Sequence, residues 1–239
     1  MQIYISNKEL EQIALGLVQV SCGEPPPKRI DIDRIAAYLG IDVVYEQIAE
    51  DDFDKIGFAA DGRTPLIVLR DGQRVSIVFP KDTVVLEKFL INRAENNRRR
   101  FVLAHEISHV LIRRADPLRS VACFNRAYDM ERTYSVKELH DRMSLEEYQA
   151  NAMAAMILMP RMVLTDSVRR HLRRNAIPVY GDCIFLPKMK PALQKMSEEL
   201  GVSYTAMLIQ LRKYGLLEQR SMEEYFKKTM PNGGAVYGY

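Results

Sequence analysis

The chain has 239 residues, enough to bury one substantial core with or without an appendage, and we expect no second full domain. Hydrophobic residues make up 47% and charged residues 27%, a balance typical of a globular protein and not of a disordered one. The 34 Lys and Arg residues exceed the 31 Asp and Glu residues by only three, so no global electric field favours nucleic acid or an anionic membrane.

The sequence carries no recognisable targeting signal and no paired cysteine motif. The start MQIYISNKELEQ lacks a charged segment followed by a long apolar run, and no stretch approaches the ~20 apolar residues of a membrane span. We therefore expect a cytoplasmic protein that does not contact membranes. Cys22, Cys123 and Cys183 are odd in number and far apart, which predicts reduced thiols and not a disulfide framework or thiolate metal site.

The first half of the chain predicts two helices and a sheet. A capping box at Ser6–Glu9 opens an amphipathic helix over 7–21, which GEPPP at 23–27 ends, and Asp33 is expected to cap a short helix. The strand IDVVYEQI follows, and then four more apolar β-rich runs between 56 and 90, with Asp-Gly pairs at 61–62 and 71–72 that suit tight hairpin turns. Together these runs predict a small, mainly antiparallel sheet.

The second half is predicted to be helical. The apolar period becomes helical near Asn96, and an irregular segment follows at 115–134. A short helix is predicted to start at Ser135, and a longer helix is predicted to start at Ser144 and to end at Pro160. A basic helix at VRRHLRR, a loop at IPVYGD, a strand at CIFLPK and a pair of helices between 191 and 215 complete the pattern.

The stretch RRRFVLAHEISHVLIRR, residues 98–114, holds two of the four histidines, with a glutamate beside the first. On a helix, residues four apart share a face, so His105 and His109 can aim imidazole nitrogens at one point, an arrangement that suits Zn²⁺. Glu106 lies one step round the helix, where its carboxylate can reach a water molecule at the metal and act as general base. The spacing therefore predicts a hydrolytic zinc site.

This motif alone is only moderately specific, because it arises by chance in roughly one chain in a few hundred. Its neighbours, among them Val102, Leu103, Ile107 and Val110, predict a helix that is buried on nearly every side. Burying two imidazoles and a carboxylate without partners would cost several kcal/mol, a penalty that a metal removes. The competing interpretation is a core helix whose two histidines satisfy each other's surroundings.

A catalytic zinc normally takes three protein ligands, and Ala115 stands where a third histidine of the extended motif would lie. Glu147 is the best candidate, because it opens a helix whose small residues allow close approach to the zinc helix. It also occupies the reciprocal position of a capping box at Ser144, so spacing alone supports a ligand and a cap about equally. The reserve ligands are Glu146, Asp141 and His140.

Two segments carry a resemblance to a known family. The first is RRFVLAHEISH at 99–109, and the second comprises EYQAN at 147–151 with LMP at 158–160. Together they resemble the ImmA/IrrE family of zincin-like metallo-endopeptidases, over a region from near residue 33 to near residue 217. Two motifs in the right order and spacing are far more specific than one.

The resemblance implies an α+β fold: a reduced zincin-like domain with a short twisted sheet, an active-site helix carrying HExxH, a second ligand helix and a C-terminal helix pair. In the family, the glutamate three residues before the alanine of the second motif is the third zinc ligand, which here is Glu147. Some members cleave or otherwise inactivate a helix-turn-helix repressor. This chain departs from the pattern in its long connection at 115–143 and in its N-terminal helix, which lies outside the matched region.

These observations divide the chain into four parts. We expect an N-terminal helix and linker at 1–27, a zincin-like metallopeptidase domain at 28–190, a helix-turn-helix-like appendage at 191–230 and a disordered tail at 231–239.

Two C-terminal segments could in principle contact nucleic acid. The basic cluster Arg169, Arg170, His171, Arg173 and Arg174 is more often a solvated helix face, and no interleaved aromatic residue can stack on bases. Residues 193–214 partly match a helix-turn-helix, but the second helix offers few base-reading groups beyond Arg212 and Lys213. We therefore expect no direct nucleic-acid binding. His171 and Tyr180 could stabilise a tetrahedral intermediate, although the spacing selects neither.

The sequence thus predicts a zinc-dependent endopeptidase that holds one Zn²⁺ per chain through His105, His109 and Glu147, with Glu106 as general base. The expected substrate is a regulatory protein such as a helix-turn-helix repressor. A His, His, Glu set also accepts Mn²⁺ or Fe²⁺. One alternative is a non-catalytic zinc-binding module that controls a repressor by stoichiometric contact, and another is a transcription factor that reads DNA through residues 193–214.

Overall fold

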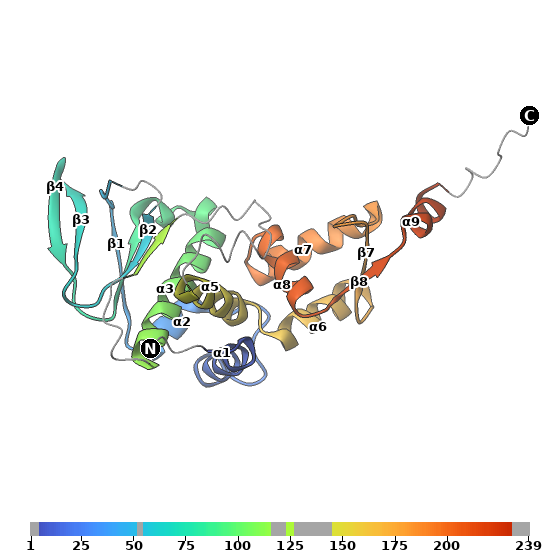
Figure 1. The fold of residues 1–239 in the computed structure, drawn as a ribbon, viewed down its shortest axis with the longest axis horizontal. Coiled ribbons are helices and arrows are strands. Elements are labelled where there is room, and N and C mark those ends of the chain that lie inside the picture. The colour runs from blue at the N-terminus through green and yellow to red at the C-terminus, as the bar shows by residue number, and fades with distance from the viewer. Residues whose placement is uncertain (1–4, 52–54, 116–122, 127–144, 231–239) are drawn as a thin grey trace, which may run out of the picture.

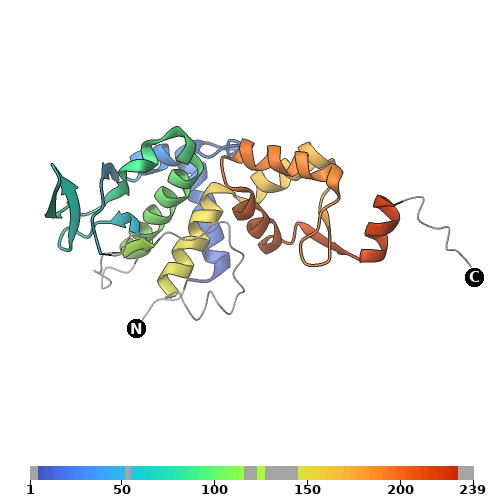
Figure 2. The ribbon, with the colours of Figure 1, turned by 90° about the horizontal axis from the view of Figure 1, so that it is seen from above.

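The computed structural model describes residues 5–51, 55–115, 123–126 and 145–230, and for 123–126 the backbone alone. Figure 1 shows the strands of the first half at one end of an elongated molecule, the helices α3 (Asn96–Ala115) and α5 (Leu145–Leu158) in its middle, and helices α6 to α9, within residues 161–229, towards the other end. The same order is seen from above in Figure 2. The main cluster of buried apolar side chains runs from Leu10 to Tyr214, and a second, smaller cluster around Phe58, Leu66 and Val68 lies under the strands β2 (Lys55–Ala59) and β3 (Pro65–Arg70).

Helix α1 (Asn7–Cys22) begins at the predicted capping box, where the Glu9 amide donates to Ser6 Oγ over 3.3 Å and the Ser6 amide donates to Glu9 Oε2 over 2.8 Å. The next helix, α2 (Ile32–Tyr38), shows that the predicted cap was wrong by two residues. Its N-cap is Asp31, which accepts from the Arg34 amide over 3.1 Å. Asp33 instead pairs with the guanidinium of Arg99.

The main sheet has the order β1-β5-β2-β6. Its β2 strand lies antiparallel to both neighbours, while β1 and β5 are parallel, so the sheet is mainly antiparallel as predicted. The strand β6 falls in a segment that the sequence predicted to be irregular. The strand bounds are Asp42–Glu46 for β1, Lys55–Ala59 for β2, Thr83–Glu87 for β5 and Cys123–Arg126 for β6.

A separate hairpin joins β3 (Pro65–Arg70) to β4 (Gln73–Val78). Its turn residues Asp71 and Gly72 have φ angles of 51° and 77°, the positive values that a two-residue type I′ turn requires, so this predicted turn is confirmed. The other Asp-Gly pair makes no hairpin, because β2 pairs with β5 and β6 and not with β3. Asp61 instead accepts hydrogen bonds from the next backbone amides, those of residues 63 and 64.

The long helix α3 (Asn96–Ala115) follows two short 3₁₀ turns, η1 (Lys88–Ile91) and η2 (Arg93–Glu95). It packs against the sheet on one side and against α5 (Leu145–Leu158) on another, and α1 covers α5 in turn. Ala150 and Ala154 on α5 are fully buried, and such small side chains let two helices approach closely. The α+β architecture with two adjacent ligand helices is therefore confirmed.

The C-terminal part joins helices to one short two-stranded sheet. The predicted strand at 183–188 was wrong, since the strand is β7 (Ile177–Tyr180), parallel to β8 (Leu217–Arg220). Pro178 made this segment resemble a loop, but an edge strand tolerates proline. The helices and the 3₁₀ turn of this part are α6 (Arg161–Leu172), η3 (Pro187–Met189), α7 (Lys190–Leu200), α8 (Tyr204–Lys213) and α9 (Met222–Thr229).

Several predictions fall outside the described residues: the helix at Ser135, the capping box at Ser144 and the disordered tail at 231–239. The four-part division of the chain stays a prediction. Of the helices described, none combines the length and the apolar character needed to cross a membrane.

Candidate metal centre

Two histidines of α3 meet on the face that packs against α5. Both side chains are buried, with exposed fractions of 0% for His105 and 1% for His109. Their Nε2 atoms lie 2.9 Å apart, and the rings meet edge to face. The four-residue spacing on one helix therefore directs both imidazoles to a common point, as the motif predicted.

Glu147 reaches the same point from the first turn of α5. Its Oε2 lies 3.3 Å from Nε2 of His105, and its Oε1 lies 3.3 Å from Nε2 of His109. Ligand atoms of a tetrahedral zinc ion are about 3.3 Å apart, given metal–ligand distances of about 2.0 to 2.2 Å. These three residues therefore fit a divalent metal, and they form the candidate ligand group found in the part of the chain that the structure describes.

Two of the reserve ligands, Asp141 and His140, lie outside the described residues. The third, Glu146, has its Oε1 3.5 Å from Nδ1 of His109, the ring nitrogen that does not face Glu147. The geometry thus places Glu146 behind the ligand group and Glu147 within it.

Burial and the neighbouring groups set the protonation states that a metal site needs. Burial lowers the pKa of His105, and the adjacent His109 lowers it further, which favours the neutral imidazole that binds metals. Burial alone would raise the pKa of Glu147, but the two imidazoles beside it hold this pKa at about 2. The site therefore presents neutral imidazole and an ionised carboxylate near neutral pH.

Asn151 stands one turn after Glu147 on α5 and was not predicted to have a role of its own. Its Oδ1 lies 3.0 Å from Nδ1 of His105. An amide oxygen can only accept, so Nδ1 carries the proton and the lone pair of His105 lies on Nε2, the atom that faces Glu147. The sequence signal was available, since residues four apart share a helix face.

Glu106 is fully buried, and neither carboxylate oxygen has a hydrogen-bond partner of normal geometry among the described residues. Burial raises the pKa of its carboxyl to about 8, against the opposing influence of His109 and Arg113. A carboxyl group held with a pKa near neutrality can take up and release a proton during a reaction. This is the property expected of a general base.

Comparison with known families agrees with this geometry. The IrrE N-terminal-like domain, Peptidase_M78, matches residues 89–212, more than half of the chain, and the match contains both ligand helices. The chain belongs to the Peptidase_M78 family. No curated protein gave a match. The family and the ligand group together show a metallopeptidase-like domain.

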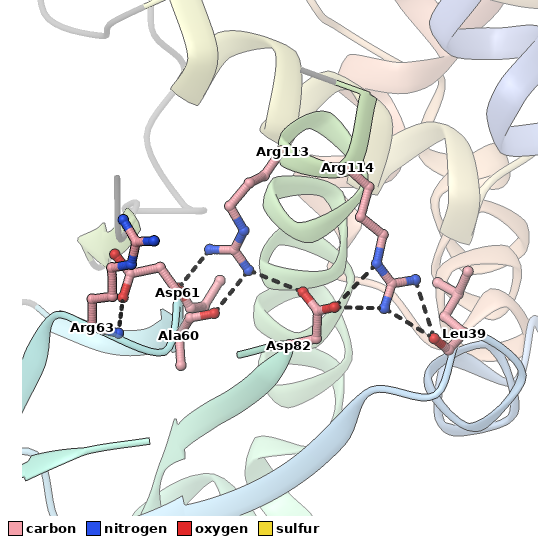
Figure 3. A network of polar contacts seen from close by, with 8 residues as sticks. Leu39, Ala60, Asp61, Arg63, Asp82, Arg113 and Arg114 are labelled. Atoms are coloured by element: carbon pink, nitrogen blue, oxygen red, sulfur yellow. Dashed lines mark hydrogen bonds and ion pairs between the residues drawn. The ribbon is translucent and has the colours of Figure 1, made fainter. Parts of the chain in front are cut away.

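In this Peptidase_M78 protein, Arg113, one turn beyond His109, connects helix α3 to the sheet by hydrogen bonds. The Arg113 guanidinium is buried and donates to the Ala59 and Ala60 carbonyls over 3.2 and 2.8 Å (Figure 3). It also approaches Asp82 to 3.4 Å, and Asp82 binds Arg114 as well. The end of β2 is therefore fixed relative to α3.

The Peptidase_M78 domain gives other partners to the two residues considered for stabilising an intermediate. His171 Nε2 lies 2.8 Å from Glu199 Oε2, and the Tyr180 hydroxyl accepts from Lys228 over 3.3 Å. The basic cluster is partly paired too, since Arg170 donates to Glu199 over 2.7 Å. These contacts support a structural role for both residues.

Proposed function

We propose that this protein is a zinc-dependent endopeptidase. The observation that carries the proposal is the combination of three convergent ligands, His105, His109 and Glu147, with the buried carboxylate of Glu106, which lies on the same helix as the two histidines. Burying that carboxylate in a core helix with no metal and no function would be costly. Zinc is preferred to other divalent ions because two imidazoles and one carboxylate in a tetrahedral spacing are typical of catalytic zinc sites.

A divalent cation held by His105, His109 and Glu147 would supply Lewis-acid chemistry, polarising the scissile carbonyl and lowering the pKa of the attacking water. Glu106 takes the proton of that water as it attacks and delivers it to the leaving amine nitrogen. The Asn151 amide keeps the Nε2 lone pair of His105 directed at the site. Burial of these side chains strengthens their electrostatic interactions by excluding bulk water.

The proposed substrate is a regulatory protein of the cytoplasm, such as a helix-turn-helix repressor. This part of the proposal rests on the family resemblance. It is supported indirectly by α8, where only Arg212 and Lys213 are exposed, so this helix offers little surface for reading DNA.

The test compares the zinc-loaded protein with its Glu106→Gln variant on a proteome-derived peptide library, with new N-termini read by mass spectrometry. Glutamine keeps the shape and cannot accept the proton, so cleavage should fall by about 100- to 10,000-fold while bound zinc per chain stays the same. Cleavage retained by the variant would refute the mechanism. Absence of cleavage by both proteins, with relief of repression retained by the variant in a reporter assay, would favour the stoichiometric module.

A further inference from the structure

Gly57, in the middle of β2, lies directly against the carboxylate of Glu106. A Cβ atom added at Gly57 would stand 2.6 Å from Oε1 of Glu106 and 3.1 Å from its Cδ, and it would stand 2.8 Å from Cγ1 of Val102. Non-bonded carbon and oxygen atoms do not approach so closely at ordinary cost. With the chain arranged as it is, position 57 has no room for any side chain.

The backbone conformation does not require glycine at this position. Gly57 is absent from the residues with positive φ, so an L-amino acid could adopt its backbone angles. Glycine in the interior of a strand weakens the strand, and it usually marks a bend, a bulge or a place where another group comes close to the backbone. The pairing of β2 with β6 does shift register between Lys55 and Gly57, which is typical of strands that re-aim side chains next to a site.

The side chain that Gly57 approaches is that of Glu106, whose carboxylate must be held in place to act as general base. The carboxylate of Glu106 is fully buried, and no hydrogen bond of normal geometry from a described residue fixes it. Packing therefore contributes to the side-chain conformation of Glu106. On the β2 side, Gly57 is the residue that borders this carboxylate, and Val102 of α3 lies against the same glycine.

We propose that Gly57 is a positioning residue, whose missing side chain provides the space in which the Glu106 carboxylate lies. This inference rests on the proposed function, because Glu106 is the general base of that mechanism. It does not follow from family membership, since Gly57 lies outside the matched residues 89–212. A side chain at position 57 would push the carboxylate away from β2 and out of line with the substrate.

The first test is Gly57→Ala, measured on the peptide bond that the wild type cleaves best in the peptide library. The kcat should fall by about 100-fold, the loss expected for a catalytic group displaced by about 1 Å, with KM and bound zinc per chain nearly unchanged. The matched control is Gly16→Ala, the same substitution on α1, where an added Cβ meets nothing within 4 Å and activity should be retained. Wild-type kcat in Gly57→Ala would overturn the proposal.

The second test needs no activity, so it separates failure of this inference from failure of the proposed function. Thermal unfolding of the metal-free protein is compared for Gly57→Ala in the wild type and in a Glu106→Ala background. If Gly57 makes room for Glu106, the loss in Tm is much smaller once Glu106 is shortened. An equal loss in both backgrounds refutes the inference. If Gly57→Ala alone does not fold, the same comparison is made with Val102→Ala added throughout, which removes the other close contact.

Discussion

Replacement of Asn151 by leucine tests whether the metal centre depends on more than its three ligands. The Asn151 Oδ1 accepts from Nδ1 of His105 over 3.0 Å, and the His105 side chain is fully buried. Leucine keeps the volume and removes the acceptor, which leaves a buried N–H unpaired at a cost of about 1 to 3 kcal/mol. Much of this cost falls on the tautomer and ring orientation that bind metal. We therefore expect zinc affinity to fall by about 10- to 100-fold.

The assay is competition for zinc against a chromophoric chelator at fixed pH. Asn151→Asp retains an acceptor at the same place and should bind zinc at least as well as Asn151→Leu and close to the wild type. Asn175→Leu is the surface control, because Asn175 is exposed and accepts from Arg169 far along the chain from the ligands. Zinc affinity of Asn151→Leu within about twofold of the wild type would refute the reasoning about the hydrogen bond to His105.

Two further predictions concern stability. Arg113→Met should lower the free energy of unfolding by about 2 to 3 kcal/mol, because a buried charged donor to two carbonyls is lost. Arg114→Met, whose side chain is 34% exposed, should cost less than about 1 kcal/mol, and urea unfolding of both variants checks the difference. The hydrogen bond from Arg170, with that from His171, lowers the pKa of Glu199 from 4.5 to about 2, so this carboxylate stabilises the fold above pH 4.5 and progressively less as pH falls towards 2. Glu199→Gln should remove that part of the acid dependence, which is checked by measuring the free energy of unfolding between pH 2 and 4.5. If this free energy falls equally steeply with decreasing pH in the wild type and the variant, the assignment is contradicted.

Much of the fold was open to prediction because local signals and tertiary packing agree. The Ser6–Glu9 box starts α1, the Asp71-Gly72 pair turns the hairpin, and the helical period from Asn96 marks α3. Where two residues suit the same N-cap, the prediction from sequence was wrong. Both Asp31 and Asp33 suit an N-cap, and the choice depends on Arg99, a residue 66 positions away that draws Asp33 into an ion pair.

The metal centre shows the same division. The helical spacing of His105 and His109 brings their nitrogens together without help from the rest of the chain. Whether Glu147 faces them or caps its own helix depends on how α5 packs on α3, which no local pattern records. The space beside Gly57 could not be found from the sequence, because it depends on how strand β2 and helix α3 meet at the Glu106 carboxylate. Positions that depend on one helix could be predicted from spacing alone, whereas Glu147 also needed the family resemblance and Gly57 needed the structure.

The ligands also come from two helices made at different times. Glu147 lies 38 positions after His109, so a growing chain exposes the two imidazoles of α3 before α5 exists. A pair of histidines on a single helix is an incomplete site, and the full affinity for an ion develops only when the second helix docks. Tight metal binding is therefore expected only after α5 has packed against α3. Any ion at this site would bind with full affinity only to a chain whose core has already folded.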